Sequence, residues 1–242
     1  MTRKRVAIVQ SSYIAWKGYF DLIRAVDEFI LLDEVQFTKR DWRSRNRIKT
    51  KDGLHWLSVP VRTSGRRFQT IAETILVDHA WARRHWLTIE SAYARAPYFG
   101  AYAGPFEHLY VAARFDRLSE VNHAFTVAAC RALEITTPIT WSSDYSARAG
   151  RNDRLIDLCV QAGATDYLSG PRARGYIDEA AFAAAGVSVN FADYSGYPEY
   201  DQLYPPYEHA VSVLDLLFCV GPAARDYMKD LRATSLHAGA ME

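Results

Sequence analysis

Short apolar runs alternate along the chain with amphipathic segments. Residues 5–9 (Arg-Val-Ala-Ile-Val) and 28–32 are two such runs, and each has the length of a buried strand. Residues 16–26 lie between them and carry Phe20 and Ile23 at helical spacing, so we expect a helix there. A strand, a helix and a second strand within about 30 residues match the size of a right-handed parallel crossover unit.

The same alternation continues to the C-terminus. Further strands are expected at 56–61, 71–77, 138–142, 166–168 and 187–191, and further helices at 78–93, 106–133, 152–162, 177–185, 209–218 and 223–231. This order predicts an α/β fold with a mostly parallel, Rossmann-like sheet flanked by helices. We expect one domain, 1–242, with a helix-rich insertion at about 78–135 that is broken at 96–106. A mobile tail is expected from about 232.

Residues 33–49 form the most unusual stretch. Asp33 and Glu34 open it directly after a predicted strand, and Lys and Arg make up six of its seventeen residues, with Phe37 and Trp42 among them. Ligands of open α/β sheets bind at the carboxyl ends of strands, and the Arg fork donates paired hydrogen bonds to phosphate or carboxylate. We therefore interpret the stretch as a basic, aromatic loop that binds an anionic substrate. The alternative is a solvated charged surface anchored by one tryptophan.

Two turns are further candidates for anion binding. Residues 10–13 (Gln-Ser-Ser-Tyr) precede a predicted helix N-terminus, which attracts anions. Residues 169–176 (Ser-Gly-Pro-Arg-Ala-Arg-Gly-Tyr) follow a predicted strand and suit a phosphate, although an ordinary β–α turn has the same pattern. In a parallel sheet this second turn would lie on the same side as Asp33, so we expect the two to converge.

Carboxylates at strand ends are the candidate catalytic groups. Asp33 and Asp193 are candidate general bases, together with Gln10 as a third catalytic candidate. Lone aspartates at strand ends also form turns, and aromatic residues also fill cores, so both alternatives stay open. The candidate substrate-binding residues are Tyr13, Trp16, Tyr19, Lys39, Arg40, Trp42, Arg45, Asn46, Arg47, Lys49, Ser169, Arg172 and Tyr176.

Composition narrows the classes of function. The formal net charge is +1, from 29 basic and 28 acidic residues, whereas general binders of nucleic acid or membrane surfaces carry a stronger bias. The apolar run after the basic N-terminus is too short for a signal peptide, and none approaches the roughly 18 residues of a membrane span. We therefore expect a cytoplasmic protein that does not contact a membrane.

Metal and nucleophile motifs are missing from the sequence. The seven histidines lack the spacing of a metal site, so none is predicted. Cys130, Cys159 and Cys219 form no Cys-x-x-Cys pair and are expected to be reduced, buried thiols. Neither common phosphate loop occurs, and the Gly-x-Ser-x-Gly elbow of α/β-hydrolases is absent.

Five segments resemble the WbqC-like protein family. They are QSSYIAWKGYFDLI (10–23), DEVQFTKRDWRSRNRIKT (33–50), WLSVPV (56–61), YLSGP (167–171) and SVLDLLF (212–218). The resemblance runs from about 5 to 228. It implies a bacterial enzyme encoded among genes for O-antigen and other cell-surface polysaccharides. Such an enzyme is expected to modify a nucleotide-linked amino sugar by acyl or aminoacyl transfer.

The residue types are compatible with this implied activity. A pyrophosphate would suit the basic residues, a base or sugar would stack on Trp16, Tyr19 or Trp42, and Asp33 or Asp193 would deprotonate the sugar amine. The residues assigned to the pyrophosphate are Lys39, Arg40, Arg45, Arg47 and Arg172. The partner is then a small molecule, a nucleotide sugar. The acyl donor, a need for ATP and Mg²⁺, and the oligomeric state stay open.

Two other functions remain in competition. The strand, the Gln-Ser-Ser-Tyr turn and the later Ser-Gly-Pro turn loosely match an ATP-dependent nucleotidyltransferase-like ligase, although its His-x-Gly-His signature is missing. Alternatively, the Arg-rich stretch binds RNA, DNA or a partner protein without catalysis. The near-neutral net charge argues against nucleic acid.

Overall fold

Five parallel strands form the central sheet of the computed structural model, which describes residues 3–232. The strands are β1 (Arg5–Val9), β2 (Glu28–Leu31), β5 (Ile139–Trp141), β6 (Asp166–Ser169) and β7 (Ser188–Phe191). Their order is β5-β2-β1-β6-β7, and all four pairings are parallel. The predicted α/β fold with a mostly parallel sheet is therefore confirmed.

The strand order fixes where a ligand can bind. From β1 the chain moves outward to β2 on one side and later returns to place β6 on the other side. Val6 of β1 accordingly pairs with Glu28 of β2 and with Tyr167 of β6. Ligands of open parallel sheets bind at the carboxyl ends of strands where the order reverses in this way. The loops that follow β1, β2 and β6 are thus the candidate site.

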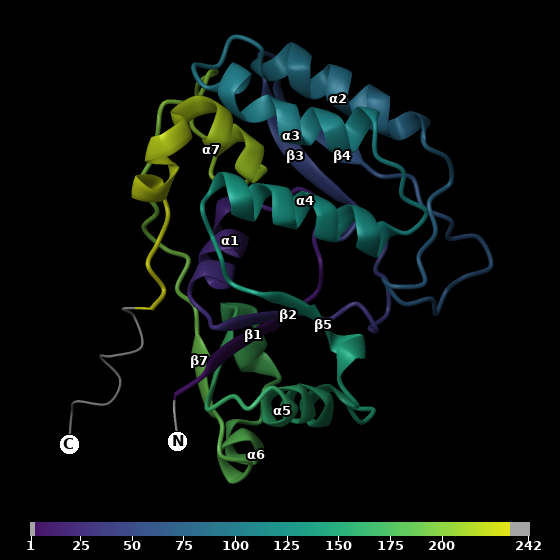
Figure 1. Cartoon of the computed structure of the whole chain (residues 1–242), viewed down its shortest axis with the longest axis vertical. Coiled ribbons are helices and arrows are strands. Elements are labelled where there is room, and N and C mark those ends of the chain that lie inside the picture. Colours follow the sequence, from purple (N-terminus) through teal and green to yellow (C-terminus); the bar gives the residue numbers. More distant parts are fainter. Residues whose placement is uncertain (1–2, 233–242) are drawn as a thin grey trace.

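Helices cover both faces of the sheet. They are α1 (Lys17–Arg24), α2 (Ala80–Tyr93), α3 (Phe99–Val111), α4 (Leu118–Ala132), α5 (Arg151–Gln161), α6 (Glu179–Ala184) and α7 (Val213–Val220). Figure 1 shows α1 and α4 on one face and α5 and α6 on the other. In β2, Phe29 and Leu31 pack into the core on the α1 side, whereas Ile30 packs with α5. Burial on both faces explains why the strands are apolar throughout.

An antiparallel hairpin stands apart from the sheet. It consists of β3 (Arg45–Thr50) and β4 (Gly53–Ser58), and β3 packs beside α2 and α7 (Figure 1). The expectation that all of 33–49 is a loop is therefore wrong from Arg45 onward. Asn46 and Ile48 point into the protein and are fully buried or nearly so. Arg45 and Arg47 alternate with them on the outer face and are half-buried, and their charge hides the alternation that marks a strand.

The helix-rich middle is confirmed, but its boundaries differ from those predicted. The expected break at 96–106 is wrong because α3 begins at Phe99 and continues through Pro105. Phe106 and Tyr110 of this helix are each 1 % exposed, so packing outweighs the hydrogen bond that proline cannot donate. The single helix expected at 106–133 is two helices, α3 and α4.

Three other predicted elements differ in the structure. Residues 71–77 contain only isolated bridges, Val61–Leu76 and Ile75–Arg117, instead of a strand. The helix expected from 209 begins at Val213, and the last helix is a 3-10 helix, Gly221–Tyr227. The tail predicted from about 232 lies outside the described residues apart from its first residue. The interpretation of the chain as one domain stays a prediction.

Two features of the structure concern membrane spans and cysteine chemistry. Within residues 3–232, no helix combines the length and the apolar character needed to span a bilayer. Cys130, Cys159 and Cys219 are free and buried, as predicted. Burial raises the pKa of each thiol to about 12, so all three are protonated and unreactive at neutral pH.

Candidate functional site

Asp33 is a buried carboxylate at the carboxyl end of β2. Asp33 is 2 % exposed, and its Oδ1 accepts a hydrogen bond of 2.9 Å from the Ser11 backbone N–H. The second oxygen, Oδ2, is buried and has no partner among the described residues. Burial raises the pKa of Asp33, against the opposing effect of the Ser11 hydrogen bonds and the Arg43 charge. A carboxylate with a raised pKa and an unpaired oxygen suits a general base.

Arg43 brings a positive charge to the same strand ends; the residue is half-buried, and its Nε atom is fully buried. Its Nη1 donates a 2.9 Å hydrogen bond to the Gln10 carbonyl oxygen, which also accepts one of 3.2 Å from the Tyr19 hydroxyl. Burial lowers the pKa of Arg43, while Tyr19, Asp41 and Asp33 oppose that shift. Gln10 therefore contacts Arg43 and Tyr19 through its backbone carbonyl.

Asn122 of α4 joins the two segments that carry these groups. Its Nδ2 donates hydrogen bonds of 2.9 Å to the Ser11 hydroxyl and 2.9 Å to the Arg43 carbonyl oxygen. The residue is fully buried, and its Oδ1 has no partner among the described residues. Asn122 thus holds the turn after β1 against the arginine segment.

Unpaired buried polar atoms concentrate around these residues. Asp33 Oδ2, Arg43 Nε and Asn122 Oδ1 are three of the seven such side-chain atoms in the described chain. Two more are the Nε atoms of Arg45 and Arg47 on the adjacent hairpin. Buried polar groups in native proteins are nearly always hydrogen-bonded, so a group of exceptions requires an explanation. A substrate that supplies the missing partners would explain it.

Asn122 and Arg43 are not among the site residues predicted from the sequence, although Arg43 lies inside the basic stretch. Asn122 falls on the apolar stripe of α4 with Leu118 and Phe125, which are both buried. A polar residue at such a core position was the available signal.

A cluster of two tryptophans and two arginines covers the outer face of the hairpin; we call it the tryptophan–arginine face. The rings of Trp42 and Trp56 lie 5.4 Å apart. The Arg45 guanidinium stands 4.1 Å from the Trp56 ring, and that of Arg47 stands 5.5 Å from it. Trp42 and Trp56 remain 37 % and 41 % exposed. Exposed indole faces beside guanidinium groups suit a nucleobase and a phosphate.

This face adjoins the Asp33 cluster through the backbone. Trp42 and Arg43 are neighbours, and the Trp42 carbonyl accepts a 3.0 Å bond from the Tyr13 N–H in the turn after β1. The structure therefore brings together the predicted residues Asp33, Trp42, Arg45 and Arg47. Lys39 and Arg40 are exposed on the turn just before them, and Arg40 has a φ of 58°.

The turn after β6 lies at the same edge of the sheet as Asp33. Because β1 alone separates β6 from β2, two strand spacings, roughly 10 Å, separate the ends of these strands. The Ser169 hydroxyl is buried and donates to the Tyr167 hydroxyl at 3.2 Å. Arg172 and Tyr176 are exposed in and after a 3-10 turn, Pro171–Gly175, so they are accessible from that side.

Three predicted substrate-binding residues point into the interior. The buried Tyr13 hydroxyl bonds to His85 Nδ1 at 2.8 Å and to the Tyr110 hydroxyl at 2.6 Å. Asn46 Nδ2 donates to two backbone carbonyls in the turn after β1, at 3.1 and 2.9 Å. Lys49 Nζ donates to the Pro206 carbonyl. These side chains position the segments of the site.

Trp16 and Asp193 have other partners as well. The Trp16 ring packs edge-on against Tyr194 and Tyr197, at 5.2 and 5.6 Å. Asp193 accepts bonds of 2.9 Å from the Ser195 N–H and hydroxyl, and these bonds lower its pKa. A lowered pKa makes Asp193 a weaker base than Asp33.

A second buried aspartate, Asp215 of α7, gives an internal comparison. Its carboxylate accepts hydrogen bonds from the Tyr93 and Tyr200 hydroxyls, both at 2.8 Å, and from Gln202 Nε2 at 2.9 Å. Burial raises the pKa of Asp215, as it does that of Asp33. Unlike Asp33, however, Asp215 has partners on both oxygens, as a structural carboxylate does.

Metal binding has no support within residues 3–232. There, no group of three or more His, Cys, Asp or Glu side chains is arranged to hold an ion.

Comparisons with known proteins give the family. The model of the WbqC-like protein family matches residues 10–227. A curated relative from Mycobacterium tuberculosis (strain ATCC 25618 / H37Rv), described as "Uncharacterized protein Rv1507c", is 48% identical over 229 residues, which cover 95% of this chain and 99% of the relative. No solved structure matches. The chain belongs to the WbqC-like protein family.

Proposed function

We propose that this protein is an enzyme that modifies a nucleotide-linked amino sugar by acyl or aminoacyl transfer to the sugar amine. Its place would be the biosynthesis of bacterial cell-surface polysaccharide or a related glycan. The observation that carries the proposal is the buried Asp33, with one unpaired oxygen, beside the half-buried Arg43 at the carboxyl edge of the sheet. Family membership supports the proposal at the level of the whole chain.

The unpaired Asp33 Oδ2 is the group that takes the proton. As the sugar amine forms a bond to the acyl carbonyl carbon, its nitrogen loses a proton to Oδ2, and the bond to the leaving group breaks with its electron pair. Burial raises the pKa of this carboxyl group, which makes Asp33 a better proton acceptor than an exposed aspartate. The Arg43 guanidinium carries the positive charge that stabilises the oxyanion formed on the acyl oxygen.

The tryptophan–arginine face binds the nucleotide part of the substrate. A base stacks on the exposed indoles of Trp42 and Trp56, and the diphosphate accepts hydrogen bonds from Arg45 and Arg47. Because Trp42 and Arg43 are consecutive, a nucleotide held on this face directs its sugar toward Asp33.

The test is turnover with a panel of nucleotide-linked amino sugars and activated acyl or aminoacyl donors. Asp33→Asn should lower the rate by about 10²–10⁴-fold, the usual contribution of a general base, without unfolding the protein. The matched control is Asp193→Asn, the other candidate base, which should keep the wild-type rate. Full activity of Asp33→Asn would remove Asp33 from the mechanism, and loss of activity only in Asp193→Asn would transfer the role to that residue.

The tryptophan–arginine face also favours a second candidate function. Exposed tryptophans next to arginines stack on the bases of single-stranded nucleic acid. Strongly salt-dependent binding of an oligonucleotide, without any response to nucleotide sugars, would select this alternative. The near-neutral net charge of +1 makes it the weaker of the two.

A further inference from the structure

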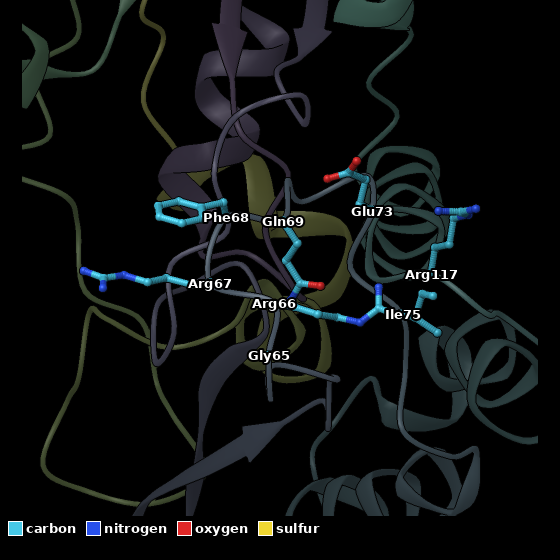
Figure 2. A pocket seen from close by; sticks show the side chains of 8 residues that line it. All are labelled: Gly65, Arg66, Arg67, Phe68, Gln69, Glu73, Ile75 and Arg117. Carbon is cyan, nitrogen blue, oxygen red and sulfur yellow. The ribbon is translucent and has the colours of Figure 1, made fainter.

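A shallow open pocket of about 460 Å³ lies beside the Asp33 segment. It is lined by residues 65–69, by Glu73 and Ile75, and by Arg117, which directly precedes α4. Its volume is within the range of roughly 300–1,000 Å³ that is typical of small-molecule sites. Figure 2 shows Arg66 and Arg117 on one side of the view and Arg67 and Phe68 on the other, with Glu73 above them.

Gln69 gives this pocket an unpaired hydrogen-bond acceptor. The residue is 8 % exposed, and its Nε2 donates a 2.8 Å hydrogen bond to the Arg62 carbonyl. That bond fixes the orientation of the amide, so Oε1 has to be the free atom. Oε1 is buried without a partner among the described residues and points toward the side of Arg66 (Figure 2). A ligand that enters the pocket can satisfy it with an N–H donor.

Charged side chains of both signs line the same pocket. The Arg66 guanidinium makes no side-chain hydrogen bond within residues 3–232, and Arg117 uses Nη1 to reach the Ala72 carbonyl at 3.2 Å. Glu73 accepts two bonds from Thr70 on Oε2, at 2.8 and 3.0 Å. The two guanidinium groups suit a carboxylate. Glu73 and Gln69 Oε1, in contrast, suit a positively charged amine.

The mixture of charges selects among ligands. A polyanion would gain from the two arginines but would meet the Glu73 carboxylate and leave Gln69 Oε1 unpaired. A ligand that carries a carboxylate and an ammonium group on neighbouring atoms satisfies both sets. The side chain of Ile75 supplies an apolar wall for the rest of such a molecule.

We propose that this pocket binds a free α-amino acid, with its carboxylate on Arg66 and Arg117 and its ammonium group on Gln69 Oε1 and Glu73. The inference goes beyond the proposed function and does not depend on it, because it concerns binding and assigns no reaction step. The pocket nevertheless adjoins the candidate active site. The Ala72 N–H donates a 2.9 Å bond to the Asp33 carbonyl, which joins the segment that forms the pocket directly to the segment of Asp33.

Calorimetric titration of the full chain with the twenty common L-amino acids tests the proposal. At least one should bind, and its N-acetyl and carboxamide derivatives should each bind at least about tenfold more weakly, because each lacks one of the two charges. Arg66→Ala should weaken binding of that amino acid by about tenfold or more. The matched control is Arg67→Ala, a neighbouring arginine on the opposite side, which should stay within about twofold of wild type.

Three results would overturn the proposal: no binding by any amino acid, equal binding of the N-acetyl derivative, or equal loss in Arg66→Ala and Arg67→Ala. Equal binding of the N-acetyl form would mean a site for anions only. Arg66 and Arg67 are exposed, so neither variant is expected to unfold the chain. Asp33→Asn should keep the amino acid affinity while losing turnover, so the two proposals can fail separately.

Discussion

The two buried aspartates should respond in opposite directions when each is replaced by asparagine. Asp33 and Asp215 are both almost completely buried, and burial raises the pKa of both. They differ in their partners: Asp33 has one unpaired oxygen, whereas both oxygens of Asp215 accept hydrogen bonds. Asparagine removes the buried charge at either position but keeps only one acceptor oxygen. The sign of the effect therefore depends on what the second oxygen was doing.

At position 33 the gain should exceed the loss. Asparagine can keep the 2.9 Å bond from the Ser11 N–H through its carbonyl oxygen, and its amide group replaces an oxygen that had no partner. Removing a poorly paired buried charge should raise the free energy of unfolding at pH 7 by about 1 kcal/mol. For a chain of this size that corresponds to a rise of about 2–4 °C in Tm.

At position 215 the loss should dominate. The three donors are Tyr93, Tyr200 and Gln202, and an asparagine amide would turn its own donors toward at least one of them. Hydrogen bonds to charged groups contribute about 1.5–3 kcal/mol each, so Asp215→Asn should lower the free energy of unfolding by about 2–4 kcal/mol.

Urea denaturation of the two variants beside wild type measures both effects without any substrate. The midpoints should move apart while the slope m stays constant, because neither change alters the surface exposed on unfolding. Shifts of the same sign in both variants would refute the argument from hydrogen-bond partners. A stabilised but inactive Asp33→Asn would mean that the protein carries a buried charge for function at a cost in stability.

Three further predictions concern other parts of the fold. Burial lowers the pKa of His85 to about 4, so the unfolded state, with a pKa of about 6.5, binds the proton first as the pH falls. Between pH 7 and about pH 4.5 the wild type should therefore lose about 2 kcal/mol of its free energy of unfolding, whereas the His85→Gln variant should not show this loss. Denaturation curves of both proteins at both pH values measure the difference. Gly221 has a φ of 53°, and a Cβ there would lie 2.4 Å from the Tyr98 ring, so Gly221→Ala should lower stability by about 2–4 kcal/mol; a melting curve like wild type would contradict the assigned conformation. Trp56→Ala should weaken nucleotide-sugar binding by about tenfold, measured by titration, and Arg45→Ala should do the same; unchanged affinity in both would place the nucleotide elsewhere.

The sheet was predictable because its strands are buried on both faces. Continuous apolar runs such as residues 5–9 have few other structures available, and the helical segments between them require parallel connections. Strand β3 was not predictable in the same way. Its outward residues Arg45 and Arg47 gain their order from Trp42 and Trp56, which are contacts that only the folded chain brings together.

The candidate site was predictable only in part for a similar reason. Asp33 could be predicted because it comes directly after a strand, and the exposed arginines could be predicted because so many of them lie in one stretch. The roles of Tyr13 and Asn46 depend on the direction of each side chain, because both would suit a ligand equally well if they pointed outward. Asn122 contributes from a helix about 80 residues beyond Arg43, a distance over which a single sequence carries no pairing signal.

The bridge made by Asn122 also sets the order in which the site can form during synthesis. Its side chain donates hydrogen bonds to Ser11, which lies 111 positions upstream, and to Arg43, which lies 79 positions upstream. A nascent chain that has not yet completed α4 therefore carries Asp33 and the basic stretch without the contact that fixes them together. Closing loops of this length slows folding, so the site should be among the last parts of the protein to become ordered. Fragments that end before α4 should accordingly lack the assembled site even if their first strands pair.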